Sequence, residues 1–277
     1  MSSITQEYIQ ADGLKTFVVK AGNGHPLLLI HGASPGASSL VNWKLNIEPL
    51  AAQGFAVYAY DQPGFGYTEN PTDHSIEYRV AHAKAVINAL GLETFHVVGN
   101  SVGGYIAARL ALEDKRVAGF VTTTSGSLSP QGSADSQKLA QKHSEELREY
   151  EPSVENMRRL TSGTIYNKEL VTDELVLERY EMSTGKNYEA QIQRRKAPRQ
   201  RPVHGELHNL RVKTLLLWGN NDRGVSVERG LELFKNIPGA EFHLFDKCAH
   251  WVQWDQADRF NQLIGAFLKG STRISTI

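Results

Sequence analysis

The sequence predicts an α/β fold in which a mostly parallel sheet is covered by helices on both faces. Strand-like runs alternate with helical patterns along most of the 277 residues, as in chains built from βαβ units. The strand-like runs are almost continuously apolar, which is typical of parallel strands buried on both faces. The alternation stops between about residues 126 and 212, where polar residues and helical patterns dominate. We therefore expect a helical insertion there.

The expected elements follow in a regular order. Two β-rich segments, 16–20 and 26–30, flank residues 21–24, whose glycines and asparagine favour an antiparallel hairpin. Apolar residues recur on one face of segment 76–90, which predicts a helix. The remaining expected strands are 56–60, 96–99, 119–124, 214–218 and 241–245. The remaining expected helices are 102–112, 173–182, 231–235 and 257–268.

This order divides the chain into two parts. Residues 1–125 and 212–277 are expected to form the core, and residues 126–211 a helical lid. Ligands of open α/β sheets bind outside the carboxyl ends of the strands. An insertion that leaves this end is therefore expected to cover the binding site and to act as a lid.

Composition and charge exclude several classes of partner. Lys plus Arg and Asp plus Glu both number 30, so no net charge attracts nucleic acid or an anionic membrane. No apolar run reaches the roughly 20 residues that span a bilayer. Cys248 is the single cysteine, and the first residues lack the basic and apolar regions of a secretory signal. We expect a cytoplasmic protein with no nucleic-acid or membrane partner.

The strongest chemical signal is a G-x-S-x-G motif centred on Ser101. It runs from Gly99 to Gly103, between an apolar strand-like run and a helical pattern. In a strand–turn–helix elbow of this kind the serine backbone is strained, and glycines flank it because side chains there would collide with the neighbouring backbone. The context predicts Ser101 as a nucleophile, whereas the bare pattern also fits a surface turn.

A nucleophilic serine needs a histidine base and an acid that orients the base. Asp222 and His250 follow the expected strands 214–218 and 241–245, in the chain order Ser, acid, His that belongs to the α/β-hydrolase fold. Asp246 is a competing acid, but it shares the short histidine loop. We expect Asp222 to orient His250.

The oxyanion hole is expected at two backbone amides. His31 ends the strand-like segment 26–30 and begins a His-Gly loop, the place where this fold carries one oxyanion donor. The other donor follows the nucleophile. We assign the hole to the amides of Ala33 and Val102. Other histidines, including His143 in the insertion, are expected to have surface or packing roles.

Several motifs together resemble those of the meta-cleavage product hydrolases, which hydrolyse carbon–carbon bonds in bacterial aromatic degradation. The resemblance extends from about His31 to Leu268. It rests on these stretches: His31-Gly32-Ala33-Ser34-Pro35-Gly36-Ala37, Asn42-Trp43, Asp61-Gln62-Pro63-Gly64-Phe65-Gly66, Gly99-Asn100-Ser101, Lys196-Ala197-Pro198 and Cys248-Ala249-His250-Trp251. The Asn before the nucleophile and the Trp after the histidine are more specific than G-x-S-x-G.

The resemblance implies an α/β-hydrolase fold with an eight-stranded, mostly parallel sheet. It implies hydrolysis of the C5–C6 bond of a 2-hydroxy-6-oxo-hexa-2,4-dienoate, a small-molecule substrate, with no cofactor or metal. The substrate carboxylate and its neighbouring oxygen would be held at positions matching Asn42, Asn100, Arg179 and Trp251. An arginine suits a carboxylate because its planar fork pairs both oxygens. A solvated lid arginine is the alternative for Arg179.

The chain departs from the family pattern at several positions. Ala33 and Ser34 replace glycines of the oxyanion loop, and Val102 replaces a common methionine. Thr164 and Gly224 stand where relatives often have aromatic residues, which implies a reshaped pocket for the C6 substituent. The sequence does not identify that substituent.

Other functions remain open at this point. A carboxylesterase or lactonase would use the same Ser-His-Asp triad, and a binding protein on this fold would lack a working one. We also expect a homo-oligomer, a dimer or larger. The basic residues late in the insertion are interpreted as a solvated lid face; they are Arg194, Arg195, Lys196, Arg199 and Arg201.

Overall fold

One eight-stranded sheet runs through the molecule. The computed structural model describes residues 4–198 and 201–270. The strand order is β1-β2-β4-β3-β5-β6-β7-β8. The strands are β1 (Thr5–Ala11), β2 (Leu14–Ala21), β3 (His25–Ile30), β4 (Phe55–Tyr60), β5 (Phe95–Asn100), β6 (Val117–Thr123), β7 (Lys213–Gly219) and β8 (Glu241–Phe245). All neighbouring strands from β4 to β8 pair in parallel, which confirms the predicted mostly parallel sheet.

Both faces of this sheet carry buried apolar side chains. Leu28 and Ile30 of β3 pack into one apolar cluster, and Leu27 and Leu29 pack into the other. This follows from the two-residue period of a strand, which sends successive side chains to opposite faces. The parallel strands are therefore apolar at nearly every position, as the sequence indicated.

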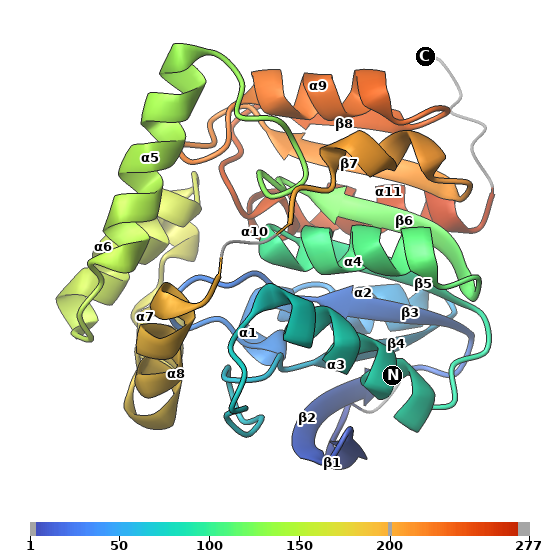
Figure 1. Cartoon of the computed structure of the whole chain (residues 1–277), viewed down its shortest axis with the longest axis horizontal. Helices are drawn as coiled ribbons and strands as arrows, with labels where there is room; N and C mark the ends of the chain where they lie inside the picture. The colour runs from blue at the N-terminus through green and yellow to red at the C-terminus, as the bar shows by residue number, and fades with distance from the viewer. Residues whose placement is uncertain (1–3, 199–200, 271–277) are drawn as a thin grey trace.

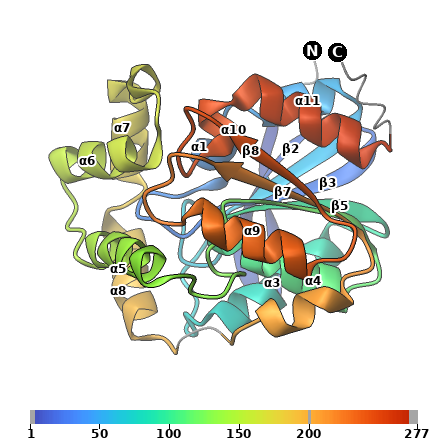
Figure 2. The same ribbon diagram turned by 90° about the horizontal axis from the view of Figure 1, so that it is seen from above.

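Helices cover the two faces. Helices α3 (Ile76–Ala89), α4 (Val102–Glu113) and α9 (Val227–Asn236) contribute to the first cluster. The second cluster includes side chains of α1 (Ser39–Trp43), α2 (Ile47–Ala52), α10 (Val252–Asp255) and α11 (Ala257–Leu268). Figure 2 shows α11 on one side of the sheet and α3 and α4 on the other. The helices expected at 76–90, 102–112 and 257–268 are thus present, and the one expected at 231–235 is longer.

The predicted hairpin between residues 16–20 and 26–30 is wrong. Strand β2 pairs antiparallel with β1, which the sequence analysis missed, and with β4, whereas β3 pairs in parallel with β4 and β5. The hairpin turns instead at Asp12 and Gly13, whose φ angles are 53° and 75°, as a two-residue turn requires. Gly22 and Gly24 are needed instead because the chain entering β4 passes close to them. A Cβ on Gly22 would lie 2.2 Å from the Phe55 carbonyl oxygen, and a Cβ on Gly24 would lie 1.8 Å from the Gly54 carbonyl oxygen.

The residues between β6 and β7 form helices beyond one end of the sheet (Figure 1). They are α5 (Ala134–Arg148), α6 (Val154–Thr164), α7 (Asp173–Glu181) and α8 (Gly185–Lys196), with short 3₁₀ helices η1 (Lys168–Leu170) and η2 (His204–Asn209). Ser133, Ser153 and Thr172 cap α5, α6 and α7 by accepting a backbone N–H three residues on. Because β6 leads into α5, this end is the carboxyl end of the parallel strands.

Two apolar clusters support these helices. Tyr150, Met157, Leu160 and Val176 pack together within the insertion. Leu207 of η2 packs with the core helices, although it falls inside the expected insertion of 126–211. Within the described part of the chain, no helix is long and apolar enough to cross a membrane.

Candidate active site

Ser101 lies in a strained turn between β5 and α4. Its φ and ψ are 54° and −120°, a backbone conformation that non-glycine residues rarely adopt. The flanking glycines are required by close approach: a Cβ on Gly99 would lie 2.2 Å from the Gly103 carbonyl oxygen, and one on Gly103 would lie 2.2 Å from that of Ile30. The G-x-S-x-G motif thus forms the predicted elbow, with Ser101 at the start of α4.

His250 and Asp222 form a buried hydrogen-bonded pair. His250 Nδ1 lies 2.7 Å from Asp222 Oδ2, and the other carboxylate oxygen accepts the backbone N–H groups of Gly224 and Val225. Burial alone would raise the pKa of Asp222, but the neighbouring His250 and these hydrogen bonds lower it below its usual value. The carboxylate is therefore ionised and holds the imidazole in one orientation.

Asp246, the competing acid, forms no hydrogen bond or ion pair with His250 in the part of the chain that the structure describes. Its side chain is exposed, and its backbone carbonyl accepts a hydrogen bond from the Gln256 side-chain amide. A different acid supports the histidine loop. The carboxylate of Asp255 accepts the N–H of Ala249, together with those of Tyr166 and Asn167 from the insertion. Asp255 thus links the His250 loop to the segment after α6.

Ser101 and His250 line one small cavity. Its volume is about 80 Å³, and its other lining residues are Gly32, Ala33, Ser34, Asn100, Val102, His143, Leu147, Thr164 and Trp251. Within the described residues, neither Ser101 Oγ nor His250 Nε2 has a hydrogen-bond partner. Catalytic hydrogen bonds are often long without substrate and shorten in the complex, so this geometry is compatible with a nucleophile and its base.

The loop after β3 presents a backbone amide to this cavity. His31 is fully buried; its Nε2 accepts the Gln62 N–H at 3.0 Å, so Nδ1 carries the proton and donates to the Gly32 carbonyl at 2.6 Å. Burial lowers the pKa of His31 to about 3, and the ring is neutral. Because the peptide is planar and trans, the Ala33 N–H points away from that carbonyl. The ring therefore fixes the orientation of the Ala33 amide.

The Ala33 and Val102 amides are free to bind an oxyanion. Neither N–H donates a hydrogen bond to another residue in the described ranges 4–198 and 201–270. Val102 is also the first residue of α4, where the helix dipole favours negative charge. Both predicted oxyanion donors thus lie beside Ser101.

Arg179 is completely buried and has no acidic partner among the described side chains. Its guanidinium donates to Thr161 Oγ1 at 3.0 Å and to Ser34 Oγ and the Pro35 carbonyl at 3.2 and 3.0 Å. It also lies 4.7 Å from the ring centroid of Trp251. Burial lowers the pKa of Arg179 to about 10, so the group remains charged at neutral pH. The alternative of a solvated lid arginine is wrong.

The remaining predicted carboxylate-binding residues differ in their relation to the cavity. Trp251 and Asn100 line it, and Arg179 contacts its lining residues Ser34 and Trp251, whereas Asn42 does not line it. Asn42 is fully buried in α1, and neither atom of its side-chain amide has a hydrogen-bond partner; Asn100 Oδ1 is likewise unpaired. Unpaired buried polar atoms are costly, so a ligand or water that satisfies them is favoured.

Comparisons with known proteins identify the family. Residues 25–257 match the alpha/beta hydrolase fold family. The chain is 36% identical to the 2-hydroxymuconate semialdehyde hydrolase of Pseudomonas sp. (strain CF600), over 94% of this chain and 92% of that protein. The solved structure of a meta-cleavage product hydrolase from Pseudomonas fluorescens IP01 is 32% identical, with a TM-score of 0.84 over 96% of this chain and 98% of that one. The chain belongs to the meta-cleavage product hydrolases. It is also 33% identical to the 2-hydroxy-6-oxononadienedioate/2-hydroxy-6-oxononatrienedioate hydrolase of Pseudomonas sp., over 90% of this chain and 89% of that protein.

This meta-cleavage product hydrolase has a site residue that the sequence analysis assigned to packing. His143 of α5 lines the cavity, and its ring centroid lies 6.0 Å from that of His250. Burial, followed by the nearby His250, lowers the pKa of His143. The sequence signal that could have identified His143 is helical spacing. Leu139, His143 and Leu147 recur every fourth residue and therefore share one face of α5.

His143 also changes the expectation for the C6 pocket. Thr164 lines the cavity, and its carbonyl accepts the Trp251 N–H at 3.2 Å. Gly224 does not line it. A Cβ on Gly224 would lie 2.5 Å from the His143 ring, so the histidine fills the space that a larger residue at 224 would take.

The basic residues late in the insertion of this hydrolase are not one solvated face. The Arg194 guanidinium stacks 3.8 Å from the ring centroid of Phe65 and donates to the Gly64 carbonyl at 2.7 Å. Arg195 donates to the Tyr150 carbonyl, and Arg201 pairs with Glu206. Lys196 is exposed, and Arg199 lies outside the described residues. None of the described ones contributes to the cavity.

No group of three or more His, Cys, Asp or Glu side chains is placed to hold a metal ion in the part of the hydrolase that the structure describes. The chemistry available at the cavity is that of a serine, a histidine–aspartate pair and backbone amides.

Proposed function

We propose that the protein hydrolyses the C5–C6 bond of a 2-hydroxy-6-oxo-hexa-2,4-dienoate to 2-hydroxypenta-2,4-dienoate and a carboxylic acid. One observation carries the choice of substrate class. Arg179 is fully buried without an acidic partner, beside the cavity that contains Ser101 and His250. A buried charge is stable only when it is paired, so this guanidinium favours an anionic ligand.

The reaction begins with a proton shift. Carbon is a poor leaving group, so the dienol first becomes a keto form, which allows the departing fragment to leave as a stabilised enolate. His250, oriented by Asp222, moves protons in this shift. In the same step, polar groups around the C1 and C2 oxygens stabilise the negative charge that develops on those oxygens.

Ser101 then acts as the nucleophile. His250 accepts its proton while the serine oxygen attacks C6, and the amides of Ala33 and Val102 stabilise the oxyanion. The C5–C6 bond breaks, and its electron pair passes into the conjugated enolate. The proton that His250 took from Ser101 passes to the enolate oxygen at C2, which gives 2-hydroxypenta-2,4-dienoate and leaves His250 neutral. Water activated by His250 then hydrolyses the acyl-serine and releases the carboxylic acid.

The C1 carboxylate is held on the side of the cavity formed by Ser34 and Trp251. Arg179 contacts both residues and reaches the ligand through a modest rearrangement of this wall. The unpaired side-chain atoms of Asn42 and Asn100 supply further donors and acceptors. Thr164 and His143 define the opposite side, where the C6 substituent lies, and Gly224 acts on this side only by leaving room for the His143 ring.

The relatives' names span several C6 substituents. They include a semialdehyde, a 6-phenyl compound and nonadienedioates, whose C6 substituent ends in a second carboxylate. A spectrophotometric screen with yellow ring-cleavage products of these types tests the proposal. Loss of colour, with 2-hydroxypenta-2,4-dienoate as product, supports it. Hydrolysis of simple esters or lactones without any loss of colour would favour a carboxylesterase or lactonase.

We also propose a cytoplasmic homo-oligomer. Strand β8 is an outer strand of the sheet, and Leu244 on it is 45% exposed. Helix α9, whose Phe234 contacts Phe242 of β8, carries Leu231 and Phe234, each 42% exposed. An unpaired edge strand beside exposed apolar side chains favours pairing with a second copy. Light scattering during size-exclusion chromatography measures the mass, and a monomer at micromolar concentration would contradict the oligomer.

A further inference from the structure

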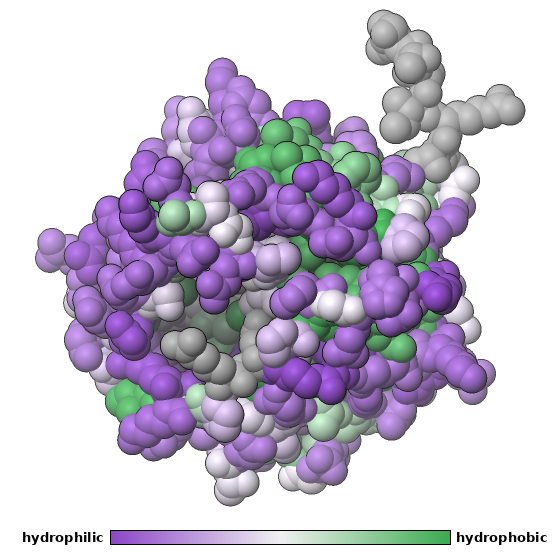
Figure 3. Space-filling model, turned by 45° about the horizontal axis from the view of Figure 1, so that its top comes forward, coloured by the Kyte–Doolittle hydropathy of each residue, from purple (hydrophilic) through white to green (hydrophobic). Residues whose placement is uncertain are grey.

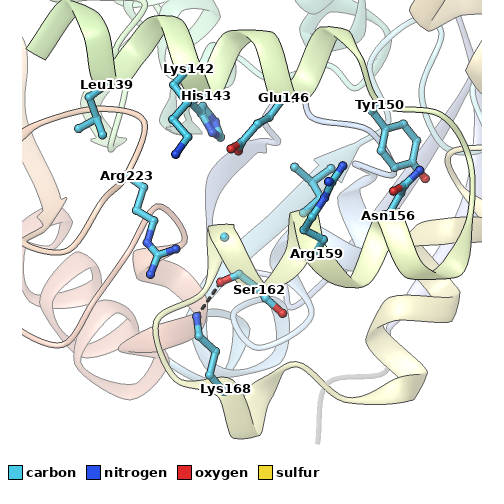
Figure 4. A pocket seen from close by; sticks show the side chains of 12 residues that line it. Leu139, Lys142, His143, Glu146, Tyr150, Asn156, Arg159, Ser162, Lys168 and Arg223 are labelled. Carbon is cyan, nitrogen blue, oxygen red and sulfur yellow. Dashed lines mark hydrogen bonds between the residues drawn. The ribbon is translucent and has the colours of Figure 1, made fainter.

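A larger cleft adjoins the catalytic cavity on the side of His143. It has a volume of about 420 Å³ and lies between α5 and α6, with Arg223 from the loop after β7 as part of its wall. His143 lines both spaces and is therefore the boundary between them. Figure 4 shows Lys142 entering this cleft from α5 above and Arg223 from the loop at the left, with Lys168 near Ser162 below them.

Positive charge predominates in the cleft. Its charged lining residues are Lys142, Arg159, Lys168 and Arg223, against the single acid Glu146. None of Lys142, Arg159 and Arg223 is paired with an acidic side chain among the residues that the structure describes. Figure 3 shows mostly hydrophilic side chains at the left of the molecule, where the helices of the insertion lie in Figure 1.

Two of the cations, Lys168 and Arg223, are close enough to repel each other. Burial and then the charge of Arg223 lower the pKa of Lys168, whose ammonium donates to the carbonyls of Ser162 and Ile165 at 2.6 Å. An anion between these groups would relieve this repulsion. These cations are only partly buried, so each one contributes modestly to the binding of an anion. Appreciable binding requires several of them to act together.

The position of the cleft identifies which part of the substrate reaches it. The C1 carboxylate is assigned to the side of Ser34, Trp251 and Arg179, and the C6 carbonyl to Ser101. The cleft begins at His143, on the side assigned to the C6 substituent. Only a group at the far end of that substituent extends into it.

We propose that this cleft binds a carboxylate at the end of the C6 substituent, so that the preferred substrates are dioates and the acyl product is a dicarboxylic acid. The inference rests on the proposed carbon–carbon hydrolysis for its orientation of the substrate. It adds a substrate class and a specificity role for Lys142 and the neighbouring cations of the cleft.

The test compares two substrates that differ only in the distal charge. They are 2-hydroxy-6-oxonona-2,4-diene-1,9-dioate and 2-hydroxy-6-oxonona-2,4-dienoate, whose C6 substituent is a neutral propyl group. The wild-type ratio of kcat/KM, dioate over propyl, is expected to be about tenfold or more. Lys142→Met should lower this ratio about threefold and Lys142→Glu about tenfold, since an exposed ion pair is worth a factor of a few.

A matched control lies on the same helix. Lys138 is one turn before Lys142, is exposed and does not line the cleft. Lys138→Glu changes the net charge by the same amount and should leave the ratio unchanged. Cations that only attract anions to the surface would respond equally to Lys138→Glu and Lys142→Glu. That result, or a wild-type ratio near one, would overturn the inference.

A second measurement separates this inference from the proposed function. Inhibition of p-nitrophenyl acetate hydrolysis is compared for succinate and butyrate, which have the same chain length and differ in one carboxylate. Succinate should inhibit severalfold more strongly, and Lys142→Glu should remove the difference. If neither dienoate is cleaved but this preference is present, the proposed function fails and the anion site stands. Equal inhibition by the two acids, insensitive to Lys142, would refute the site.

Discussion

Replacement of Arg179 by glutamine should separate carbon–carbon hydrolysis from ester hydrolysis. The arginine is fully buried, has no acidic partner among the described residues and contacts two residues of the cavity wall, Ser34 and Trp251. Glutamine keeps a polar group of similar length but removes the charge. The substrate carboxylate then loses its charged partner, whereas a small neutral ester offers no carboxylate to bind.

The expected decrease in kcat/KM follows from the hydrogen bonds that the substitution removes. A hydrogen bond to a charged group contributes about 1.5–3 kcal/mol, and glutamine replaces part of a two-pronged pair. A loss of about 3 kcal/mol lowers kcat/KM for the dienoate by about 10²-fold. Arg179 also holds Ser34 and the Pro35 carbonyl, so some general disturbance of the wall is expected. The ester rate measures that disturbance.

Both activities are measured on the same preparation, by loss of dienoate colour and by release of p-nitrophenol from p-nitrophenyl acetate. Arg158→Gln is the matched control, because Arg158 lies in α6 of the same insertion and pairs at the surface with Asp173. It should change neither activity by more than about twofold. If Arg179→Gln lowers both activities equally, Arg179 has a structural role and the argument from its buried charge fails.

Three further predictions test the triad and the buried histidines. Ser101→Ala should lower the rate by several orders of magnitude and abolish fluorophosphonate labelling, while the folded structure and dienoate binding persist; activity within about tenfold of the wild type would refute the assignment. Asp222→Asn should lower kcat by about 10⁴-fold and Asp246→Asn by less than about twofold, and the reverse order would make Asp246 the acid. Burial lowers the pKa values of His82 and His96 from 6.5 to about 4. Between these values the unfolded chain binds protons that the folded protein excludes, so the free energy of unfolding should fall by about 2 kcal/mol per histidine from pH 7 to pH 5. Urea denaturation at the two pH values measures this, and His96→Phe should weaken the pH dependence; an unchanged dependence would contradict it.

The sheet and its covering helices were predictable because their signals are local. Apolar runs such as that of β3 alternate between two faces, and a capping residue and apolar spacing define helices such as α3. Strand pairing is not local. The turn-like residues 21–24 indicated a hairpin, but β4, far along the chain, takes the place beside β2. Strand β1 is mostly exposed, with Ile9 and Ala11 near its end packed against the core, so its pattern gave a weak signal.

The candidate site likewise contains residues that local signals predict and residues that they do not. Ser101, Asp222 and His250 follow strands, and strand ends meet at one edge of a parallel sheet, so their proximity could be inferred. Arg179 and Asn42 came only from the family resemblance, because nothing in their spacing indicates that α7 and α1 bring them to one wall. His143 lies on a helix whose packing against the core depends on the whole insertion, and the sequence alone does not fix that packing.

The contrast between His31 and His250 explains why His250, and not the histidine of the oxyanion loop, is suited to be the base. Both rings are buried, but backbone groups occupy both nitrogens of His31: the Gln62 amide donates to one, and the Gly32 carbonyl accepts from the other. That ring has no site left for a proton from the serine. In His250 the Asp222 carboxylate occupies Nδ1 alone, and Nε2 has no partner within the described residues. Hydrogen-bond partners therefore make His31 a support for the oxyanion loop and leave His250 able to take the serine proton. The sequence alone shows only a histidine after a strand in both places.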